Sequence, residues 1–278
     1  MSSEPACVGL ELESRPQSVA IVRAALTGLL EFAGAVEAVS TDVRTAVSEA
    51  CNNVVMHAYP GQVGPLRVLA RSAPGRFDVI VRDEGRGIRQ LSRDPLAGGH
   101  EHMGLGLALI SALCDQLEVS NPARGGTEVT MRFRTVAVEP EPSASQGHTW
   151  PERPDQLSGE DVVMWCQPVG LSGHLVGRVA RATAAGLGFT IAGARDLYAI
   201  ADAITALTAA TASEQLVVGV SVSAHRMTLA VGPIADAELR VRRELLTGLV
   251  DAISAEPYEQ GELLRLSLPD RGRQPVGG

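Results

Sequence analysis

Hydrophobic and polar positions along the first 134 residues change between two periods, and each change marks a new element. Alternation at every second residue predicts strands over residues 8–13, 66–71, 77–82, 117–120 and 128–134. Apolar residues at helical spacing predict helices over residues 17–34 and 105–117, and a further helix that Ser40 or Thr41 caps. That helix is expected to stop at Tyr59, because Pro60 disfavours a helical residue before it.

The order of these elements predicts the fold class. Two helices come early, hairpin-linked strands follow, and one helix stands late in this half of the chain. This order indicates a mixed, mostly antiparallel sheet with helices packed on one face. We therefore expect an α/β fold of the two-layer sandwich type, and not a doubly wound parallel sheet.

The second half repeats this order after a segment without any period. Residues 135–159 are rich in proline, acidic and small polar residues, which is typical of an exposed linker. Beyond it, strands are expected over residues 162–165, 216–222, 226–231 and 263–268, and helices over 173–187, 194–212 and 237–254. We expect residues 160–268 to form a degenerate copy of residues 6–134, and residues 269–278 to form a flexible tail. An unrelated α/β domain is the alternative.

Composition and charge exclude some classes of function. The 24 basic and 32 acidic residues give a net charge of −8, which argues against a sequence-independent grip on nucleic acid or on an anionic membrane. No apolar run approaches the roughly 18 residues of a membrane span, and no secretory signal is evident. A cytoplasmic protein is therefore expected.

Two motifs carry polar side chains. In SEACNNVVMHAY, residues 48–59, Glu49 and Asn53 share one helical stripe that His57 continues. A carboxylate and an amide one turn apart can hold a hydrated Mg²⁺ or steer a hydroxyl. In DEGRGI, residues 83–88, Asp83 ends a strand, where it can accept a hydrogen bond from an exocyclic amine.

Two further motifs are rich in glycine. In HMGLGLALI, residues 102–110, Gly104 and Gly106 precede an apolar helix, whose first N–H groups can bind an anion. In GGTEVTMRF, residues 125–133, Thr127 begins the last strand with a hydroxyl that could bond a base edge. Each motif taken singly also has a structural explanation. In the order given, these are an exposed polar stripe, a strand-to-loop turn, a close-packed helix start and a hairpin turn.

Taken together, the motifs E-x3-N, D-x-G-x-G-I, G-x-G and G-T follow one another on helix, strand, helix and strand. This pattern resembles the GHKL, or Bergerat-type, ATPase family of gyrase-type ATPases, Hsp90-like chaperones, MutL-type repair proteins and histidine kinases. The segments SEACNNVVMHAY, DEGRGI and GLGLALISALCDQLEV are similar in sequence to the motifs of one branch, the anti-sigma-factor serine kinases. The resemblance covers residues 6–134.

The resemblance implies a role for each motif. Glu49 would be the general base for a substrate serine, and Asn53 would bind Mg²⁺ bridging the ATP phosphates. Asn52 would be a second polar contact or a solvated neighbour. Residues 89–103 would form a lid. The remaining implied ATP-binding residues are Asp83 and Thr127 at the adenine, Gly85 and Gly87 in the pocket wall, and Gly104, Leu105 and Gly106 at the phosphates.

The resemblance also implies a function. The chain would be an ATP-dependent protein-serine kinase that binds a sigma factor and phosphorylates a STAS-type anti-sigma-factor antagonist. One alternative is an ATP- or ADP-binding regulatory module without phosphotransfer, and another is an ATPase without a protein acceptor. Kinases of this branch work as homodimers, so a dimer or an intramolecular pseudo-dimer is expected.

The motifs are missing from the second half. Aligning the two halves places Asp202 near Glu49 and Ala206 near Asn53. Residues 231–234, VGPI, stand in place of DEGRGI, and residues 261–262 replace Gly126 and Thr127. A copy without these groups is expected to bind no Mg-ATP.

Overall fold

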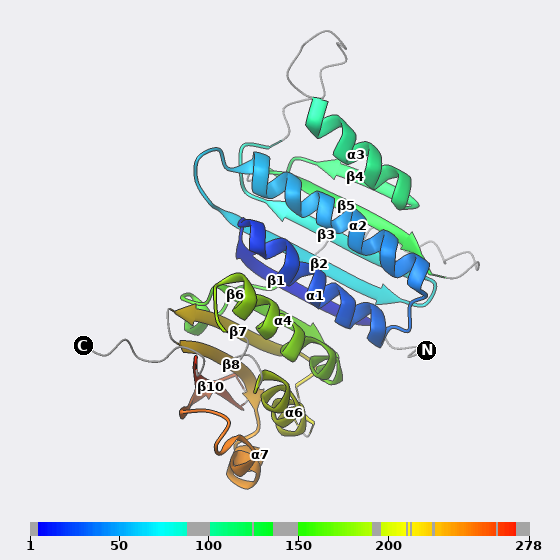
Figure 1. The fold of residues 1–278 in the computed structure, drawn as a ribbon. Coiled ribbons are helices and arrows are strands. Elements are labelled where there is room, and N and C mark those ends of the chain that lie inside the picture. Colours follow the sequence, from blue (N-terminus) through cyan, green and yellow to red (C-terminus); the bar gives the residue numbers. More distant parts are fainter. Residues whose placement is uncertain are drawn as a thin grey trace. The chain divides into compact units, whose positions relative to one another are not determined.

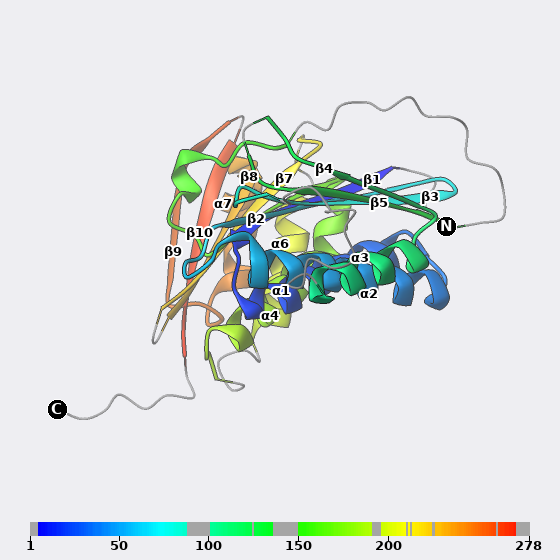
Figure 2. The same cartoon turned by 90° about the horizontal axis from the view of Figure 1, so that it is seen from above.

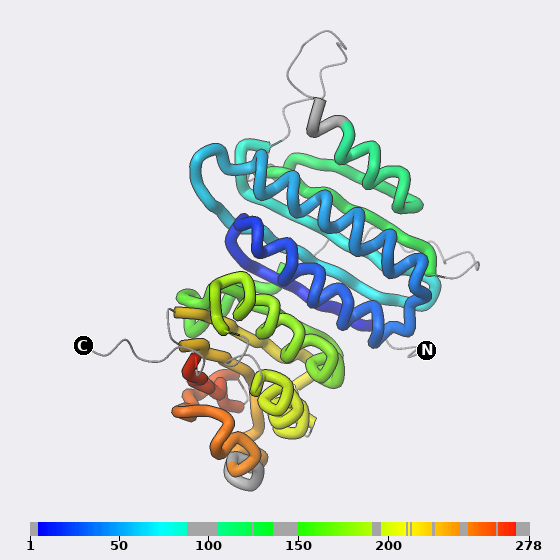
Figure 3. Tube along the Cα trace, in the orientation of Figure 1, coloured from blue at the N-terminus to red at the C-terminus, as the bar shows by residue number. Residues whose placement is uncertain are grey.

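The computed structural model describes residues 5–87, 101–123, 125–135, 150–190, 196–209, 211, 213–223, 226–259 and 261–270. These residues form two compact units. The first comprises Met1–Pro5 and Gly9–Trp150, and the second comprises Ala6–Val8 and Pro151–Gly278. Figures 1 and 3 show the helices and strands of both units.

The fold of the first unit is a sheet covered by helices on one face, as Figure 2 shows. The strands lie in the order β4-β5-β3-β2-β1, and the pairs β2–β3, β3–β5 and β4–β5 are antiparallel. The expected α/β two-layer fold is therefore confirmed. Its elements are β1 (Ala6–Glu13), α1 (Pro16–Phe32), α2 (Glu37–Asn53), β2 (Pro65–Ala73), β3 (Arg76–Asp83), α3 (Glu101–Leu113), β4 (Gln116–Ser120) and β5 (Glu128–Arg134).

Helix α2 lies at the centre of the helical layer, because it packs against both α1 and α3. Its apolar stripe is fully buried, as the spacing predicted, and consists of Val43, Ala46, Val47 and Ala50. Small side chains on this stripe let the helix approach the sheet closely. The position of α2 therefore fixes where its polar neighbours, Glu49 and Asn53, stand relative to the strands.

The start of α2 differs from the expectation. The helix begins at Glu37 after an extended Val36, with no side-chain cap, so the expected cap at Ser40 or Thr41 is wrong. The N–H of Ser40 already donates to the carbonyl of Val36 at 3.0 Å, and Ser40 therefore lies inside the helix. Glu37 supplies the favourable negative charge in the first turn.

The end of α2 agrees with the expectation and adds one feature. Residues Val54–Ala58 form a π-helical turn, and Tyr59 leaves the helix with φ −126° before Pro60. A π turn changes the direction of the side chains relative to a continuous α-helix, and such turns are frequent at functional sites.

Helix α3 is shifted toward the N-terminus relative to its prediction over residues 105–117. It spans Glu101–Leu113, so Gly104 and Gly106 lie inside the helix and do not precede it. The helix ends early because β4 begins at Gln116, where the Asp115 N–H donates to the Arg132 carbonyl on β5 at 2.8 Å. The expected lid over residues 89–103 falls mostly on residues 88–100, which lie outside the described part of the chain.

The second unit has the same element order. Its sheet runs β6-β7-β8-β10-β9, which corresponds strand for strand to β1-β2-β3-β5-β4 of the first unit. A helix pair stands between the first and second strands in both units, and one helix follows the third strand. The elements are β6 (Val162–Gln167), α4 (Ser172–Gly186), α6 (Leu197–Thr208), β7 (Leu216–Ser223), β8 (Arg226–Ile234), α7 (Asp236–Arg242), β9 (Ala252–Tyr258) and β10 (Gly261–Pro269).

Two expectations for the second half need correction. The helix expected over residues 237–254 is wrong, since α7 ends at Arg242, a short 3₁₀ turn follows, and Ala252–Tyr258 is a strand. Gly248 adopts φ +82°, which breaks the helical path. The expected tail also starts too early, because β10 reaches Pro269 and Asp270 is buried, where it accepts a hydrogen bond from the Thr190 N–H at 3.1 Å.

The end of the expected linker is packed on the second unit. Residues 136–149 lie outside the described residues, but Leu157 is fully buried with Val163 and Trp165. Gly219 makes this contact possible, because a Cβ at position 219 would lie 2.8 Å from Cδ2 of Leu157. Residues 151–159 therefore behave as part of the second unit and not as a solvated spacer.

No helix among the residues that the structure describes is long and apolar enough to cross a membrane.

A close approach between the end of β3 and the start of β5 gives a stability prediction. A Cβ at Gly126 would lie 1.9 Å from the Asp83 carbonyl oxygen, whereas a Cβ at Gly125 would meet no atom within 4 Å. Both glycines have positive φ, +85° and +90°. Gly125→Ala should therefore lower the free energy of unfolding by about 1–2 kcal/mol through strain alone, and Gly126→Ala by about 3 kcal/mol or more. Urea unfolding followed by circular dichroism measures both losses, and equal losses would contradict this packing.

Candidate functional site

A cleft opens between the C-terminal end of α2 and the strands β3 and β5 of the first unit. The space within it is about 500 Å³ when the open solvent at its mouth is included. Its walls are mostly apolar, and a few polar groups converge on it. The lining residues are Ala50, Asn53, Val54, His57, Ala58, Val81, Asp83, Arg86, Gly87, Leu107, Thr127 and Val129.

Asp83 is the buried polar group of the cleft. It is 3% exposed and stands at the last position of β3. The Gly85 N–H donates to its Oδ1 at 2.8 Å, and the Asp83 N–H donates to the carbonyl of Thr127 at 2.9 Å. Burial raises the pKa of Asp83, while hydrogen bonds from Gly85 and Thr127 and the charge of Arg82 lower it in part. The carboxyl is thus fixed in direction and can accept a hydrogen bond from a ligand amine.

Glycines allow the main chain to close around Asp83. A Cβ at Gly85 would lie 2.3 Å from the carbonyl oxygen of Ala58 at the end of the π turn. Gly87 has φ +72°, and a Cβ there would come within 3.1 Å of the Gly126 carbonyl. Both glycines therefore allow a close approach of protein main chain, and their expected place in the wall of an ATP pocket stays a prediction.

Glu49 and Asn53 lie side by side at the border between α2 and α3. A Cβ at Gly106 would lie 2.5 Å from Oε1 of Glu49 and 3.2 Å from Nδ2 of Asn53. Both side chains are half-buried, and Asn53 lines the cleft whereas Glu49 stands one helical turn before it. The missing side chain of Gly106 is therefore what leaves room for these two polar groups.

The residues present fit a magnesium ion that is bound mainly through a ligand. Among the described residues, no group of three or more His, Cys, Asp or Glu side chains could hold a metal ion alone. Mg²⁺ typically keeps several waters and takes one or two protein oxygens together with substrate phosphates. The amide of Asn53 and the carboxylate of Glu49 offer such oxygens at one place.

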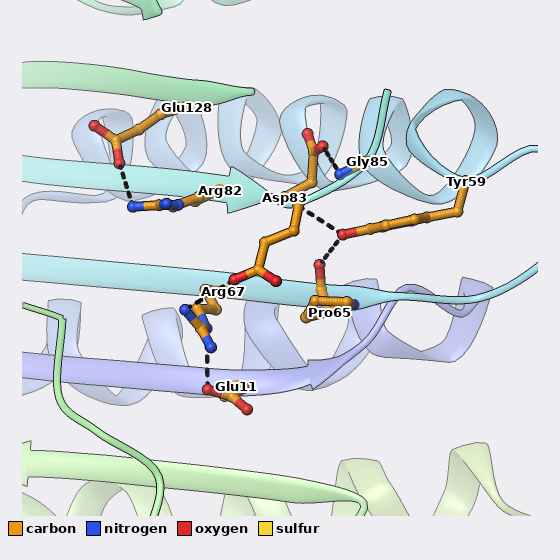
Figure 4. A network of polar contacts seen from close by, with 9 residues as sticks. Glu11, Tyr59, Pro65, Arg67, Arg82, Asp83, Gly85 and Glu128 are labelled. Atoms are coloured by element: carbon orange, nitrogen blue, oxygen red, sulfur yellow. Dashed lines mark hydrogen bonds and ion pairs between the residues drawn. The ribbon is translucent and has the colours of Figure 1, made fainter. Parts of the chain in front are cut away.

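A polar network holds the chain segment after Asp83 (Figure 4). The hydroxyl of Tyr59 donates to the carbonyl of Pro65 at 2.7 Å and accepts from the Glu84 N–H at 2.7 Å. Arg67 pairs with Glu84 at 3.2 Å and with Glu11 on β1 at 3.0 Å. The Arg86 N–H adds a bond of 3.1 Å to the Ala58 carbonyl. Three groups thus hold this segment: the Tyr59 hydroxyl, the Arg67 guanidinium and the Ala58 carbonyl.

The structure brings together some of the predicted site residues and not others. Asn53, Asp83, Gly87 and Thr127 line the cleft. Leu105 is 71% exposed and lies outside the cleft, whereas Leu107 lines it. Gly104 is the fourth residue of α3, so it lies within the helix and not in the expected position before it. Asn52 is exposed and is not among the lining residues, which favours the solvated alternative.

Sequence reasoning missed three contributors. Arg86 lies in the DEGRGI motif and Leu107 in the HMGLGLALI motif, and both line the cleft. Neither was predicted as a site residue. Tyr59 was considered only as the end of a helix, because its partners are main-chain groups that no sequence pattern reports.

Comparison with known proteins identifies the domain of the first unit. The family described as histidine kinase-like ATPase domain matches residues 12–133. A crystal structure of the RsbU and RsbW domains of a Mycobacterium tuberculosis protein is 28% identical and covers 45% of this chain and 32% of that chain. Its TM-score is 0.35, which is too low to support an argument about the fold.

Named relatives agree with this family. A serine-protein kinase RsbW of Bacillus pumilus is 32% identical over 136 residues, which cover 45% of this chain and 83% of the relative. An RsbW of Bacillus thuringiensis is 28% identical, with 40% and 76% covered. An anti-sigma F factor of Caldanaerobacter subterraneus is 34% identical over 95 residues, with 32% and 66% covered. The chain therefore belongs to the GHKL family of histidine kinase-like ATPases, in the branch of the anti-sigma-factor serine kinases.

Proposed function

We propose that this chain is an ATP-dependent protein-serine kinase that controls a sigma factor. It would bind the sigma factor and transfer the γ-phosphate of ATP to a serine of a STAS-type antagonist. The observation that carries the proposal is the joint placement of Glu49 and Asn53 against Gly106, at the border of the cleft that contains Asp83. The relatives whose printed names are serine-protein kinase RsbW and anti-sigma F factor support the same reaction class.

The geometry suits phosphoryl transfer. Such transfer depends on positioning and on charge stabilisation more than on covalent help from the protein. Asp83 and Thr127 would bind the adenine at the closed end of the cleft, and Asn53 would hold Mg²⁺ on the phosphates at the other. When bound, Mg²⁺ neutralises negative charge on the phosphates. Glu49 would accept the proton of the attacking serine hydroxyl, because a serine is a poor nucleophile unless a base takes its proton.

Glu49→Gln should abolish phosphotransfer and leave ATP binding within about threefold of the native protein. The variant keeps the shape and the hydrogen-bonding reach of the side chain but removes the base. The native protein and the variant are each incubated with native cell extract and either Mg-ATP or ADP. The partner proteins that they capture are then analysed for phosphoserine. We expect a sigma factor or a STAS-domain protein, with phosphate on the latter only after ATP.

Glu37→Gln is the matched control, since Glu37 is an exposed glutamate on the same helix and pairs only with surface groups. It should transfer phosphate normally. Capture of the same partners without phosphate would favour the nucleotide-binding regulatory module. Steady phosphate release without any partner would favour an ATPase.

We also propose that residues 160–268 are a degenerate copy of the first unit that does not bind nucleotide. The identical strand order supports this. Gly261 packs on Ile234, since a Cβ at position 261 would lie 2.6 Å from the Ile234 carbonyl oxygen. In the first unit, a Cβ at Gly126 would approach the Asp83 carbonyl oxygen in the same way. Ile234 therefore takes the place of the base-reading carboxylate, and it is fully buried. Its partner in the strand register is Glu262, where Thr127 stands in the first unit.

Isothermal titration should therefore count one ATP per native chain. Asp83→Ala should remove this binding, because the sole base-reading carboxylate is lost. Glu262→Gln should leave both stoichiometry and affinity unchanged. Two equivalents per chain, or full binding by Asp83→Ala, would show that the second unit retains a site.

The second unit could stand in for the partner subunit that kinases of this branch use. On that proposal, light scattering of the purified chain should give a monomer mass near 29.1 kDa. A stable homodimer would count against this role and would favour a separate docking surface for another protein.

A further inference from the structure

We propose that Tyr59 is a positioning residue that sets the preference of the cleft for adenine. Its hydroxyl holds the main chain at Glu84, and thereby the direction of the neighbouring Asp83 carboxyl. The inference rests on the proposed function, because it assumes that Asp83 reads the base. Tyr59 does not line the cleft, so it acts through Asp83 and not by touching the nucleotide.

The hydroxyl of Tyr59 joins two segments far apart in sequence. It donates to the carbonyl of Pro65 at the start of β2 and accepts from the N–H of Glu84, both at 2.7 Å. Figure 4 shows the side chain reaching from the end of α2 toward the segment beside Asp83. The phenol group therefore ties the chain after the helix that carries Asn53 to the chain after the strand that carries Asp83, beside the bond from the Arg86 N–H to the Ala58 carbonyl.

The ring of Tyr59 is held independently of its hydroxyl. Gly64 leaves room for it, because a Cβ at position 64 would lie 2.3 Å from Cε1 of the ring. Ala58, the residue before Tyr59, is also held in place, because its carbonyl accepts a hydrogen bond from the Arg86 N–H. The variant Tyr59→Phe should therefore keep the packing and remove only the hydroxyl.

The hydroxyl is a donor under all ordinary conditions. Burial raises the pKa of Tyr59 to about 12, so the phenol stays protonated far above neutral pH. The bond to the Pro65 carbonyl therefore persists, and the oxygen lone pairs remain oriented toward the Glu84 N–H.

Loss of the Glu84 bond should act on base discrimination. On the proposed function, the Asp83 carboxyl must point in one direction to accept a hydrogen bond from the adenine amine. Its Oδ1 also accepts a hydrogen bond from the N–H of Gly85, the residue after Glu84. The phosphates would bind at α2 and α3, which the change does not touch. A freer Glu84 main chain should therefore weaken binding of ATP more than binding of inosine triphosphate, which lacks the amine.

The test measures the ratio of ITP to ATP dissociation constants with the full chain and Mg²⁺. We expect native protein to favour ATP by at least about tenfold, since a site built to bond a substrate group rejects the analogue that lacks it. Tyr59→Phe should reduce this ratio about fivefold, with a melting temperature close to native. Tyr258→Phe is the matched control, because Tyr258 is a half-buried tyrosine of the second unit whose pKa burial also raises to about 12. It should leave the ratio unchanged.

A second variant keeps the test valid if Tyr59→Phe does not fold. Arg67→Met removes the other hold on Glu84, the ion pair at 3.2 Å, and leaves Tyr59 in place. It should reduce the ratio in the same direction by up to about twofold, because half-exposed ion pairs contribute little. A native protein without preference for ATP would refute the role of Asp83 in the proposed function. A native preference that Tyr59→Phe leaves intact, or an equal loss of ATP and ITP binding, would refute the role of Tyr59 alone.

Discussion

Burial of the Asp83 carboxyl is the constraint around which the first unit is arranged. A carboxyl group that is 3% exposed must receive hydrogen bonds from the protein, because an unpaired buried charge is strongly unfavourable. The donors come from the segment just after β3 and from the start of β5. Both segments must therefore come very close to the end of β3, and only glycine at position 126 permits that approach. The close approach of the strand ends thus lets the main chain supply the hydrogen bonds that this side chain needs.

The helical side of the cleft is fixed by a different device. The π turn at Val54–Ala58 brings Val54, His57 and Ala58 to the same cleft as Asn53. Gly106 then allows α3 to lie against the two polar residues of α2 without a side chain between them. The two devices meet at Ala58, the last residue of the π turn, because the Arg86 N–H donates to its carbonyl at 3.1 Å and Gly85 packs against it.

Local patterns in the sequence predicted most strands and the buried stripe of α2, because alternation and helical spacing directly report which face is covered. They failed where tertiary contacts decide a boundary. Helix α2 starts at Glu37 without a side-chain cap, and residues 252–258, AISAEPY, form an edge strand although they follow a helical pattern. The motif residues Asn53, Asp83, Gly87 and Thr127 could be singled out by their residue types and spacing, and the order of the motifs carried the family resemblance; all four line the cleft. Tyr59 was missed because its contribution is a pair of hydrogen bonds to main chain at Pro65 and Glu84, and main-chain partners leave no mark in a sequence.

Gly261 carries a consequence for how this chain could have diverged. Its position against Ile234 matches that of Gly126 against Asp83, yet no carboxyl group stands there to be surrounded. On the proposal of a degenerate copy, the side chains that read a nucleotide were free to drift, while the glycine was retained because the strand ends still meet too closely for any other residue. The main-chain geometry would then be retained after nucleotide binding is lost, and such glycines would mark the position of a former binding site.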